Sequence, residues 1–243
     1  MTETLERTAT GAILYDRSII NQISATSFTP AGWPHADAVR GAMGSGGRGR
    51  TLYIGNVPRQ FVLRHYRRGG LPGKLVRDRY VWFGEDETRP FREWRMLAKM
   101  AEFGLRVPRP AAARYVRRGP FYTADIITVR VPGIRPLSRV IAEGPRKAAY
   151  WSAIGGGIFE FHAAGVYHAD MNAYNVQLDN DDRVWMLDFD RGRLRAPGPW
   201  QQATLKRLHR SLRKIVTLHR GVYFGKADWD ALLEGYFDAA RSA

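Results

Sequence analysis

The sequence predicts a two-lobed α+β fold, with a small β-rich N-terminal lobe over residues 1–131 and a compact helical C-terminal lobe over residues 132–243. Short runs rich in β-branched and aromatic residues fill the first part, and such runs are typical of strands. Apolar residues at helical spacing dominate the second part. Pro132 and Gly133 separate the two patterns. Strands that precede helices in this way indicate segregated α+β layers.

The expected strands of the first lobe are bounded by glycine, proline and asparagine, which favour turns. A hairpin is expected because two of the runs are joined by Gly55, Asn56 and Pro58. One helix is expected here, beginning after Pro90 and ending at Gly104. The expected strands cover residues 11–15, 18–23, 51–54, 60–66, 114–116 and 122–131, and the helix covers residues 91–103.

The second lobe shows four stretches with helical periodicity and two short apolar runs. One stretch is strongly basic and amphipathic, with Leu205, Leu208 and Leu212 on one side. The acidic segment 179–182 separates the apolar runs, which predicts a hairpin. The helices are expected over residues 136–143, 146–164, 199–219 and 227–240, and the strands over residues 176–178 and 184–187.

Composition excludes several classes of protein. The 243 residues are 44% hydrophobic, which argues against global disorder, and cysteine is absent, which excludes disulfides and thiol nucleophiles. The formal net charge of +15 favours an anionic partner: nucleic acid, a phospholipid surface or a phosphorylated substrate. A solvated basic surface is the alternative. The N-terminus lacks a signal-peptide pattern. Glycines, Glu160 and His162 interrupt the longest weakly polar run, 151–166, so no membrane span is expected.

The chemistry is concentrated between His168 and Asp190. Asp170 precedes Asn175 by five residues, and Asp188 follows Asn175 by thirteen. The expected hairpin brings Asn175 and Asp188 together. Oxygen ligands of this kind hold Mg²⁺ against a triphosphate, while a separate carboxylate orients the attacking hydroxyl. Asn175 and Asp188 are therefore candidate metal ligands and Asp170 the candidate catalytic carboxylate. A chance run of acidic turn residues is the alternative, which the fixed spacings disfavour.

This pattern resembles the kinase catalytic loop H-R-D-x-x-x-x-N followed by D-F-G. The residues that match this pattern are His168, Asp170, Asn175, Asp188 and Phe189. The sequence departs from the pattern at two positions. Ala169 replaces the arginine that pairs with a phosphorylated activation loop, so that form of regulation is not expected. Asp190 replaces the final glycine, as either a further metal ligand or a turn cap.

Nucleotide-binding residues are expected in the first lobe, by the same resemblance. Gly44, Gly46 and Gly49 fit a phosphate-binding glycine loop, although a flexible linker has the same composition. Arg64 stands where kinases carry a strand lysine, with Glu93 as its helix partner, and Lys74 is the rival. Exposed surface charges are the alternative for that pair. Residues 128–131, which end at Val131, occupy the position of the adenine-binding hinge.

A protein kinase is not expected, because only 53 residues follow Asp190 and no A-P-E motif is present. The chain resembles instead the bacterial 3-deoxy-D-manno-octulosonic acid (Kdo) kinases. The matching segments are residues 62–71, 91–97, 167–175, 187–192, 200–202 and 205–214. The resemblance implies ATP- and Mg²⁺-dependent phosphorylation of a Kdo hydroxyl, expected at position 4, on a Kdo–lipid A precursor. It also implies a cytoplasmic enzyme on the inner-membrane surface, with no nucleic acid partner.

Two basic segments are candidates for docking the anionic acceptor or the bilayer. The first contains Arg67, Arg68, Lys74, Arg77 and Arg79, and the second contains Lys206, Arg207, Arg210, Arg213, Lys214 and Arg220. Residues 80–83 include three aromatic side chains, for which a core position is favoured over a membrane contact. An aminoglycoside-type phosphotransferase is disfavoured by the basic charge. A nucleotide-binding pseudokinase stays open because of Arg64 and Ala169, and a nucleic-acid-binding protein leaves the catalytic spacing unexplained.

Overall fold

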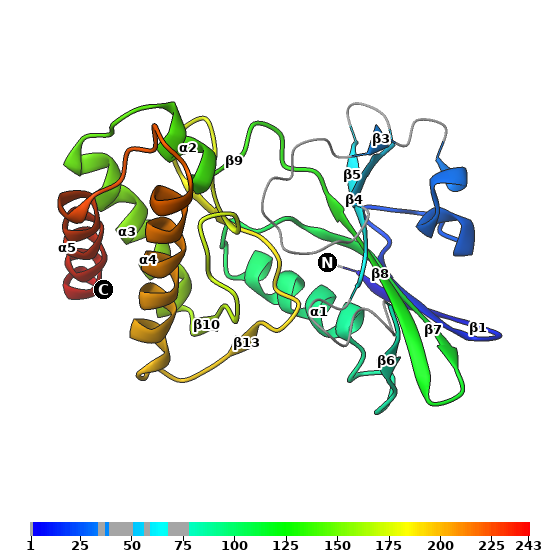
Figure 1. Cartoon of the computed structure of the whole chain (residues 1–243). Coiled ribbons are helices and arrows are strands. Elements are labelled where there is room, and N and C mark those ends of the chain that lie inside the picture. Colours follow the sequence, from blue (N-terminus) through cyan, green and yellow to red (C-terminus); the bar gives the residue numbers. More distant parts are fainter. Residues whose placement is uncertain (1, 34–36, 39–50, 56–58, 68–77) are drawn as a thin grey trace. The chain divides into compact units, whose positions relative to one another are not determined.

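The computed structural model describes residues 2–33, 37–38, 51–55, 59–67 and 78–243 (Figure 1). The chain divides into two compact units. The first comprises Met1–Lys99 and Pro108–Val131, and the second comprises Met100–Val107 and Pro132–Ala243. The end of the helix α1 (Arg89–Glu102) and the segment after it thus belong with the C-terminal half of the chain, which the sequence pattern did not indicate.

An antiparallel sheet forms the first unit. Its strands follow the order β1-β2-β7-β8-β5-β4-β3, and β6 pairs with β8. The predicted hairpin is present as β4 and β5, with Thr51 opposite Arg64. Strand β1 was not predicted. The bounds are β1 Glu3–Thr8, β2 Gly11–Asp16, β3 Asp37–Ala38, β4 Thr51–Ile54, β5 Phe61–His65, β6 Tyr80–Val81, β7 Pro110–Arg118 and β8 Phe121–Val129.

The two faces of this sheet are covered differently. Helix α1 lies against one face and buries Phe91 and Trp94, with the Phe91 ring 5.3 Å from that of Tyr115. Two short 3-10 turns, η1 (Ala25–Phe28) and η2 (Pro30–Gly32), follow β2, and Phe28 joins a second core cluster with Ile13. Ile13 and Tyr115 lie on neighbouring strands at adjacent registers, so their side chains point to opposite faces.

The predicted strand over residues 18–23 is wrong. The buried Asp16 carboxylate accepts hydrogen bonds from the Ser18 N–H (3.0 Å) and hydroxyl (2.8 Å). Its carbonyl accepts the N–H groups of Ile19 and Ile20, each at 3.0 Å. These bonds turn the chain out of the sheet, and Ile20 enters the core cluster from a turn.

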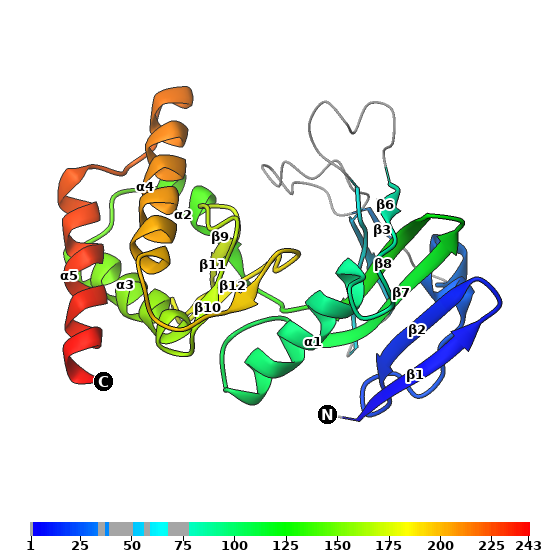
Figure 2. The same cartoon turned by 90° about the horizontal axis from the view of Figure 1, so that it is seen from below.

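The second unit contains four helices, each within three residues of the predicted limits: α2 (Leu137–Glu143), α3 (Ala148–Ala163), α4 (Trp200–Leu218) and α5 (Lys226–Ser242). Helices α3 and α5 lie side by side (Figure 2). Their backbones meet at Gly155 and Gly235, where a Cβ would come within 1.9 Å of the Leu232 carbonyl oxygen and 2.1 Å of the Ser152 carbonyl oxygen, respectively. Among the described residues, no helix combines the length and apolarity that crossing a bilayer requires.

Short strands complete the second unit. They are β9 (Arg135–Pro136), β10 (Val166–Tyr167), β11 (Val176–Leu178), β12 (Val184–Met186) and β13 (Arg193–Leu194). The predicted hairpin is β11 with β12, in which Val176 pairs with Met186. Strand β9 pairs with β11, and β10 with β13. Residues 168–175, which include the candidate catalytic Asp170, therefore lie between β10 and β11.

A buried histidine joins three helices of this unit. His162 of α3 accepts a hydrogen bond at Nδ1 from the Tyr236 hydroxyl (2.8 Å) and donates one from Nε2 to the Thr204 hydroxyl (3.0 Å). The direction of the second bond follows because Thr204 already donates to the Gln201 carbonyl at 2.8 Å. Burial lowers the pKa of His162 to about 4, so the ring is neutral at physiological pH.

Candidate active site

The candidate catalytic loop, residues 168–175, is shaped by one side chain, that of Asn172. Its Oδ1 accepts the backbone N–H groups of Tyr174 (2.8 Å) and Asn175 (3.1 Å), which forms an Asx turn. Its Nδ2 donates to the Asp170 carbonyl at 3.0 Å, and Asn175 Nδ2 donates to the same carbonyl at 2.9 Å. The loop that separates Asp170 from Asn175 is thus closed by its own amides.

His168 connects this loop to the segment that carries Asp188. The ring is buried, and its Nδ1 accepts the Asp170 N–H at 3.1 Å. Nε2 therefore carries the proton and donates to the Leu187 carbonyl at 2.8 Å. Burial lowers the pKa of His168, which favours this neutral tautomer. The ring also lies 4.7 Å from that of Phe189, so His168 positions the residues on both sides of Asp188.

The β11–β12 hairpin brings the two predicted metal ligands to neighbouring strand ends. The Leu187 N–H donates to the Asn175 carbonyl at 3.0 Å, and Asp188 follows directly. Asp188 has a φ of 65°, a left-handed conformation that costs about 1 kcal/mol or more for a residue with a Cβ. Asp190 lies in the next turn, which the Gly192 N–H closes on the Phe189 carbonyl at 2.8 Å. Strain of this kind is typical of functional sites.

The donor set fits Mg²⁺. Because Asn175 Nδ2 is bonded to the loop, the amide oxygen is the atom of that side chain available to a metal. Within the described ranges, no group of three His, Cys, Asp or Glu residues stands close enough to form an all-protein metal cage. Mg²⁺ usually has one or two carboxylate ligands and shares its remaining positions with water and phosphate oxygens. The Asn175 amide oxygen and the Asp188 carboxylate, at neighbouring strand ends, would suit that mode of binding.

Helix α4 supports the catalytic loop from outside it. Arg207 donates from NH1 to Asp170 Oδ1 at 3.0 Å, and the Ser211 hydroxyl accepts the Ala173 N–H at 3.2 Å. Sequence reasoning placed Arg207 in a basic segment but missed its pairing with Asp170. The available signal was the spacing of four residues between Arg207 and Ser211, which places two polar side chains on one side of α4.

In the first unit, Arg64 and Glu93 form the predicted pair. Arg64 NH2 lies 2.6 Å from each carboxylate oxygen of Glu93, which is 3% exposed. The Tyr66 hydroxyl also donates to Glu93, and the Arg64 guanidinium lies 4.7 Å from the centre of the Tyr66 ring. The pair is therefore a partly buried, aromatic-backed contact between β5 and α1, not a pair of exposed surface charges.

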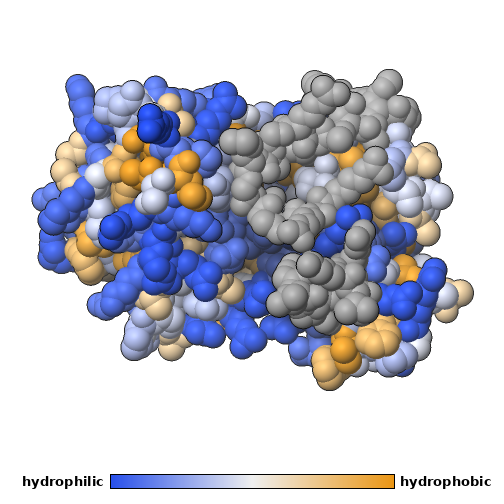
Figure 3. Space-filling view, in the orientation of Figure 1, coloured by the Kyte–Doolittle hydropathy of each residue, from blue (hydrophilic) through white to orange (hydrophobic). Residues whose placement is uncertain are grey.

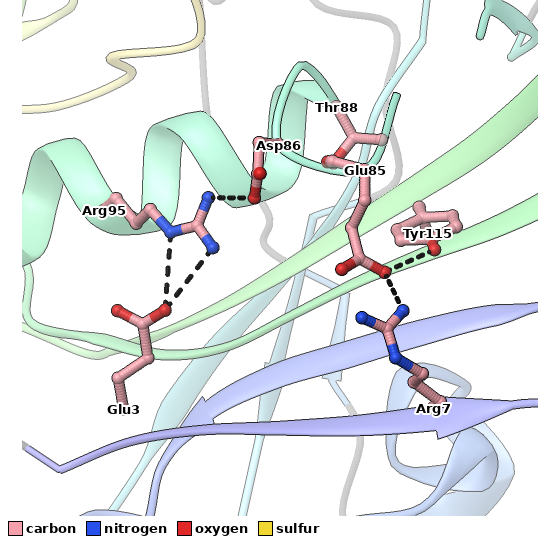
Figure 4. Close-up of polar contacts among 7 residues, drawn as sticks. All are labelled: Glu3, Arg7, Glu85, Asp86, Thr88, Arg95 and Tyr115. Carbon is pink, nitrogen blue, oxygen red and sulfur yellow. Dashed lines mark hydrogen bonds and ion pairs between the residues drawn. The ribbon is translucent and has the colours of Figure 1, made fainter. Parts of the chain in front are cut away.

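Two groups of polar contacts hold α1 on the sheet (Figure 4). Arg95 of α1 contacts Asp86 (2.8 Å) and Glu3 of β1 (3.4 Å). Glu85, just before the helix, accepts hydrogen bonds from Arg7 of β1 (2.9 Å) and from the Tyr115 hydroxyl (2.8 Å). Strand β1, which the sequence did not reveal, thus supports the helix that carries Glu93.

Of the other predicted nucleotide-binding residues, the structure describes only Val131. Gly44, Gly46, Gly49 and Lys74 lie outside the described residues. Val131 is the last residue of the first unit. The Val129 N–H donates to the Arg109 carbonyl at 2.8 Å and the Arg130 N–H to the Gln60 carbonyl at 2.9 Å. Within the described part of the chain, no such bond is present for the backbone of Val131.

Comparison with a solved structure supports the fold. The protein described as WaaP in complex with acyl carrier protein superposes with a TM-score of 0.58 over 98% of this chain and 89% of its own, at 18% sequence identity. This similarity confirms the predicted α+β, protein-kinase-like fold. At that level of identity it concerns the fold alone.

Sequence comparisons identify the family. The model of the lipopolysaccharide kinase (Kdo/WaaP) family matches residues 36–236. A protein of Vibrio parahaemolyticus is 37% identical over 228 residues, which is 94% of both chains. Proteins of Stenotrophomonas maltophilia and Xanthomonas axonopodis pv. citri are 43% and 42% identical, each over 84% of this chain and 81% of their own. All three are named 3-deoxy-D-manno-octulosonic acid kinase. The chain therefore belongs to the lipopolysaccharide kinase (Kdo/WaaP) family, and it is a phosphotransferase with a protein-kinase-like fold.

Proposed function

We propose that this chain transfers the γ-phosphoryl group of ATP to a hydroxyl of a Kdo residue, at position 4, on a Kdo–lipid A precursor. The names and similarity of its relatives support the substrate class. The observation that best supports phosphoryl transfer is the pair of hydrogen bonds made by His168. They join the backbone of Asp170 to the Leu187 carbonyl, just before Asp188. A catalytic carboxylate and a candidate metal site are thereby held as one framework.

Asp170 is the proposed catalytic residue. Its side chain is 64% exposed, while its backbone N–H and carbonyl are both tied to the loop. The carboxylate is thus accessible to an acceptor hydroxyl but fixed at its base. Asp170 orients that hydroxyl and receives its proton as the bond to phosphorus forms, which is the role of the corresponding carboxylate in kinases.

Asn175 and Asp188 are the proposed Mg²⁺ ligands, with Asp190 as either a third ligand or a turn residue. When bound, Mg²⁺ neutralises charge on the phosphate oxygens of ATP and on the leaving diphosphate. The chain's contribution is to orient the Asn175 amide through the Asp170 carbonyl and to hold Asp188 in its left-handed conformation.

The first unit is the proposed nucleotide-binding lobe. Arg64 contacts the α- and β-phosphates while Glu93 and Tyr66 hold its side chain, because a guanidinium has enough donors to engage a carboxylate and a phosphate together. The glycine loop at Gly44, Gly46 and Gly49 covers the phosphates, with Lys74 as the rival to Arg64. The backbone of Val131 is proposed to meet the adenine.

The enzyme is proposed to work at the cytoplasmic face of the inner membrane. The aromatic segment 80–83 is divided: Tyr80 is buried, as expected for a core position, whereas Phe83 is 79% exposed. Exposed Phe121 lies opposite Val81 in the β6–β8 register, beside the exposed Arg118. Figure 3 shows hydrophobic atoms on the surface at β6. Apolar side chains beside arginines suit the surface of an anionic bilayer.

The substrate proposal is tested with the purified full chain, Mg²⁺-ATP and a panel of acceptors. The panel contains a Kdo–lipid A precursor, the same precursor without Kdo, and an aminoglycoside. Mass spectrometry is expected to show one added phosphate on the Kdo-containing acceptor alone, and ³¹P–¹H NMR is expected to place it at position 4. Phosphorylation of the Kdo-free acceptor or the aminoglycoside instead would overturn the proposal.

A further inference from the structure

Helix α4 has an unusual distribution of charge. Its 19 residues include no aspartate or glutamate, and its basic residues are Lys206, Arg207, Arg210, Arg213 and Lys214. All five are exposed, and at 3.6 residues per turn they lie within an arc of about 120° on the helix surface. Hydrophilic side chains cover much of α4 in Figure 3. We call these five residues the basic face of α4.

The basic face begins at the catalytic carboxylate. Arg207 is ion-paired with Asp170, and Ser211 holds the same loop. Within the described ranges, the other four residues of the basic face have no ion-pair partner. Successive residues rise 1.5 Å along a helix, so the basic face is about 12 Å long. A row of positive charge thus extends along α4 from the proposed site of phosphoryl transfer.

Stability does not account for this arrangement. The Arg207 and Asp170 side chains are 48% and 64% exposed, and a pair so exposed contributes at most about 1 kcal/mol to folding. The neighbouring positive charges repel one another, since the helix has no carboxylate among them. A role in binding an anion explains both features.

The same geometry disfavours insertion of α4 into a bilayer. Interfacial helices bury their apolar side among lipid chains. The apolar side of α4 is already buried inside the unit, by Leu205, Leu208, Leu212 and Ile215. The exposed Leu218 lies at the C-terminal end of α4, beyond the basic face.

We propose that the basic face of α4 is the acceptor-binding surface, an inference that rests on the proposed function. Arg207 contacts the carboxylate of the Kdo residue whose hydroxyl meets Asp170, and it also holds Asp170 in position. Arg210, Arg213 and Lys214 contact phosphate groups farther along the acceptor. The planar fork of Arg207 suits this double role, because separate nitrogens can engage separate carboxylates.

The test uses a deacylated Kdo–lipid A precursor, which keeps the carboxylate and phosphates but does not require a membrane. Arg210→Ala/Lys214→Ala is expected to raise KM for this acceptor about tenfold, with kcat and KM for ATP unchanged. With the dephosphorylated acceptor the same variant is expected to match the unaltered chain. Lys226→Ala, at an exposed cation on α5, is the control and is expected to leave every constant unchanged.

Arg207 is tested against an acceptor whose Kdo carboxylate is a methyl ester. The unaltered chain is expected to lose about tenfold in kcat/KM on the ester, whereas Arg207→Ala is already impaired and loses little more. Compared with Arg207→Ala, Arg207→Lys is expected to recover part of the loss in KM and a smaller part of the loss in kcat. An ammonium retains the positive charge but not the planar fork of the guanidinium.

The results of these experiments distinguish the Kdo acceptor from a bilayer as the ligand of the basic face. The same KM is also measured with the acylated precursor in anionic vesicles. A KM change that appears only with this membrane-bound acceptor would assign the basic face to the bilayer and overturn the inference. Equal effects on phosphorylated and dephosphorylated acceptors, or none, would also overturn it. These results presuppose that the unaltered chain phosphorylates a Kdo acceptor. If it phosphorylates none, the proposed function itself fails.

Discussion

Two side chains, those of His168 and Asn172, organise the candidate catalytic loop. Asn172 closes the loop through three hydrogen bonds, and His168 ties it to the Leu187 carbonyl. Both act through fixed donor and acceptor roles, so a neutral His168 is part of the arrangement. The two candidate site residues are held through the backbone: Asp170 by its N–H and carbonyl, and Asp188 by the Leu187 carbonyl and N–H that precede it.

The sequence predicted that Asn175 and Asp188 lie at neighbouring strand ends, because one short hairpin joins them, and the structure confirms this position. The chemical roles of these two residues and of Asp170 stay predictions. The sequence also predicted the pair of Arg64 with Glu93, from one strand and one helix. It could not predict the contact of Arg207 with Asp170, because the two are 37 residues apart and meet through the packing of α4. Contacts that depend on helix packing leave only weak periodic signals in a sequence.

Asp188→Asn tests the metal assignment. The variant is expected to lose at least about tenfold of the Mg²⁺-dependent part of ATP affinity, since even residues behind metal ligands contribute that much. Isothermal titration with and without Mg²⁺ measures the difference. Asp181→Asn, at an exposed carboxylate in the turn of the same hairpin, is the control. An unchanged Mg²⁺ dependence in Asp188→Asn would contradict the assignment.

Arg64→Met tests how much the Arg64–Glu93 ion pair contributes to the free energy of unfolding. It is expected to lower the free energy of unfolding by about 3 kcal/mol, because it removes the guanidinium that lies 2.6 Å from the buried Glu93 carboxylate. Urea unfolding without nucleotide measures this loss. The double variant Arg64→Met/Glu93→Leu is expected to be less destabilised than Arg64→Met. The reverse order would show that burial of Glu93 is not the cause.

At the scale of elements, the helices were predicted more accurately than the strands. Helices α1 to α5 each have a glycine or proline near an end, and α1 and α4 also have a clear apolar period. Strand β1 was missed because nearly all of its residues are exposed, so its sequence shows no alternation of apolar and polar residues. Residues 18–23 have the composition of a strand, but side-chain bonds from Asp16 turn the chain there.

The contact of α3 with α5 is tested by two neighbouring glycines. Gly155→Ala is expected to destabilise the second unit by about 3 kcal/mol or more, because the new Cβ meets the Leu232 carbonyl oxygen at 1.9 Å. Gly156→Ala is expected to stabilise it by up to about 1 kcal/mol, since the nearest atom, Ala239 Cβ, is 3.9 Å away and alanine favours helix. Thermal unfolding of both variants measures the contrast. Equal effects would contradict the observed helix crossing.

The His162 cluster predicts a pH dependence of stability. The pKa of His162 falls from 6.5 to about 4 on folding, so between these values the unfolded chain binds more protons. The free energy of unfolding therefore rises with pH across this window, with a contribution from His162 of about 3 kcal/mol at most.

Urea titrations between pH 4 and pH 7 measure this slope. His162→Gln keeps one donor and one acceptor but does not titrate, so it is expected to flatten the slope. His219→Gln, at an exposed histidine just after α4, is expected to leave it unchanged. A slope that persists in His162→Gln would assign the pH dependence to other groups.

For the whole molecule, the order of elements predicted an α+β fold, and the resemblance of residues 168–190 to a kinase catalytic loop predicted a protein-kinase-like fold. The structural comparison confirms both. The sequence could not predict that Met100–Val107 belongs to the second unit. That segment follows α1 directly in sequence, but the Met186 N–H donates to the Arg106 carbonyl at 3.1 Å, a contact between residues 80 positions apart. Local patterns carry no information about such pairings.

The most direct test of the central claim is a single-turnover measurement of phosphate transfer from Mg²⁺-ATP to a Kdo–lipid A precursor, comparing the unaltered chain with Asp170→Asn. The variant is expected to bind Mg²⁺-ATP with nearly unchanged affinity and to transfer phosphate at least about a hundredfold more slowly. Transfer at an undiminished rate by Asp170→Asn would contradict the assignment of this loop as the catalytic centre.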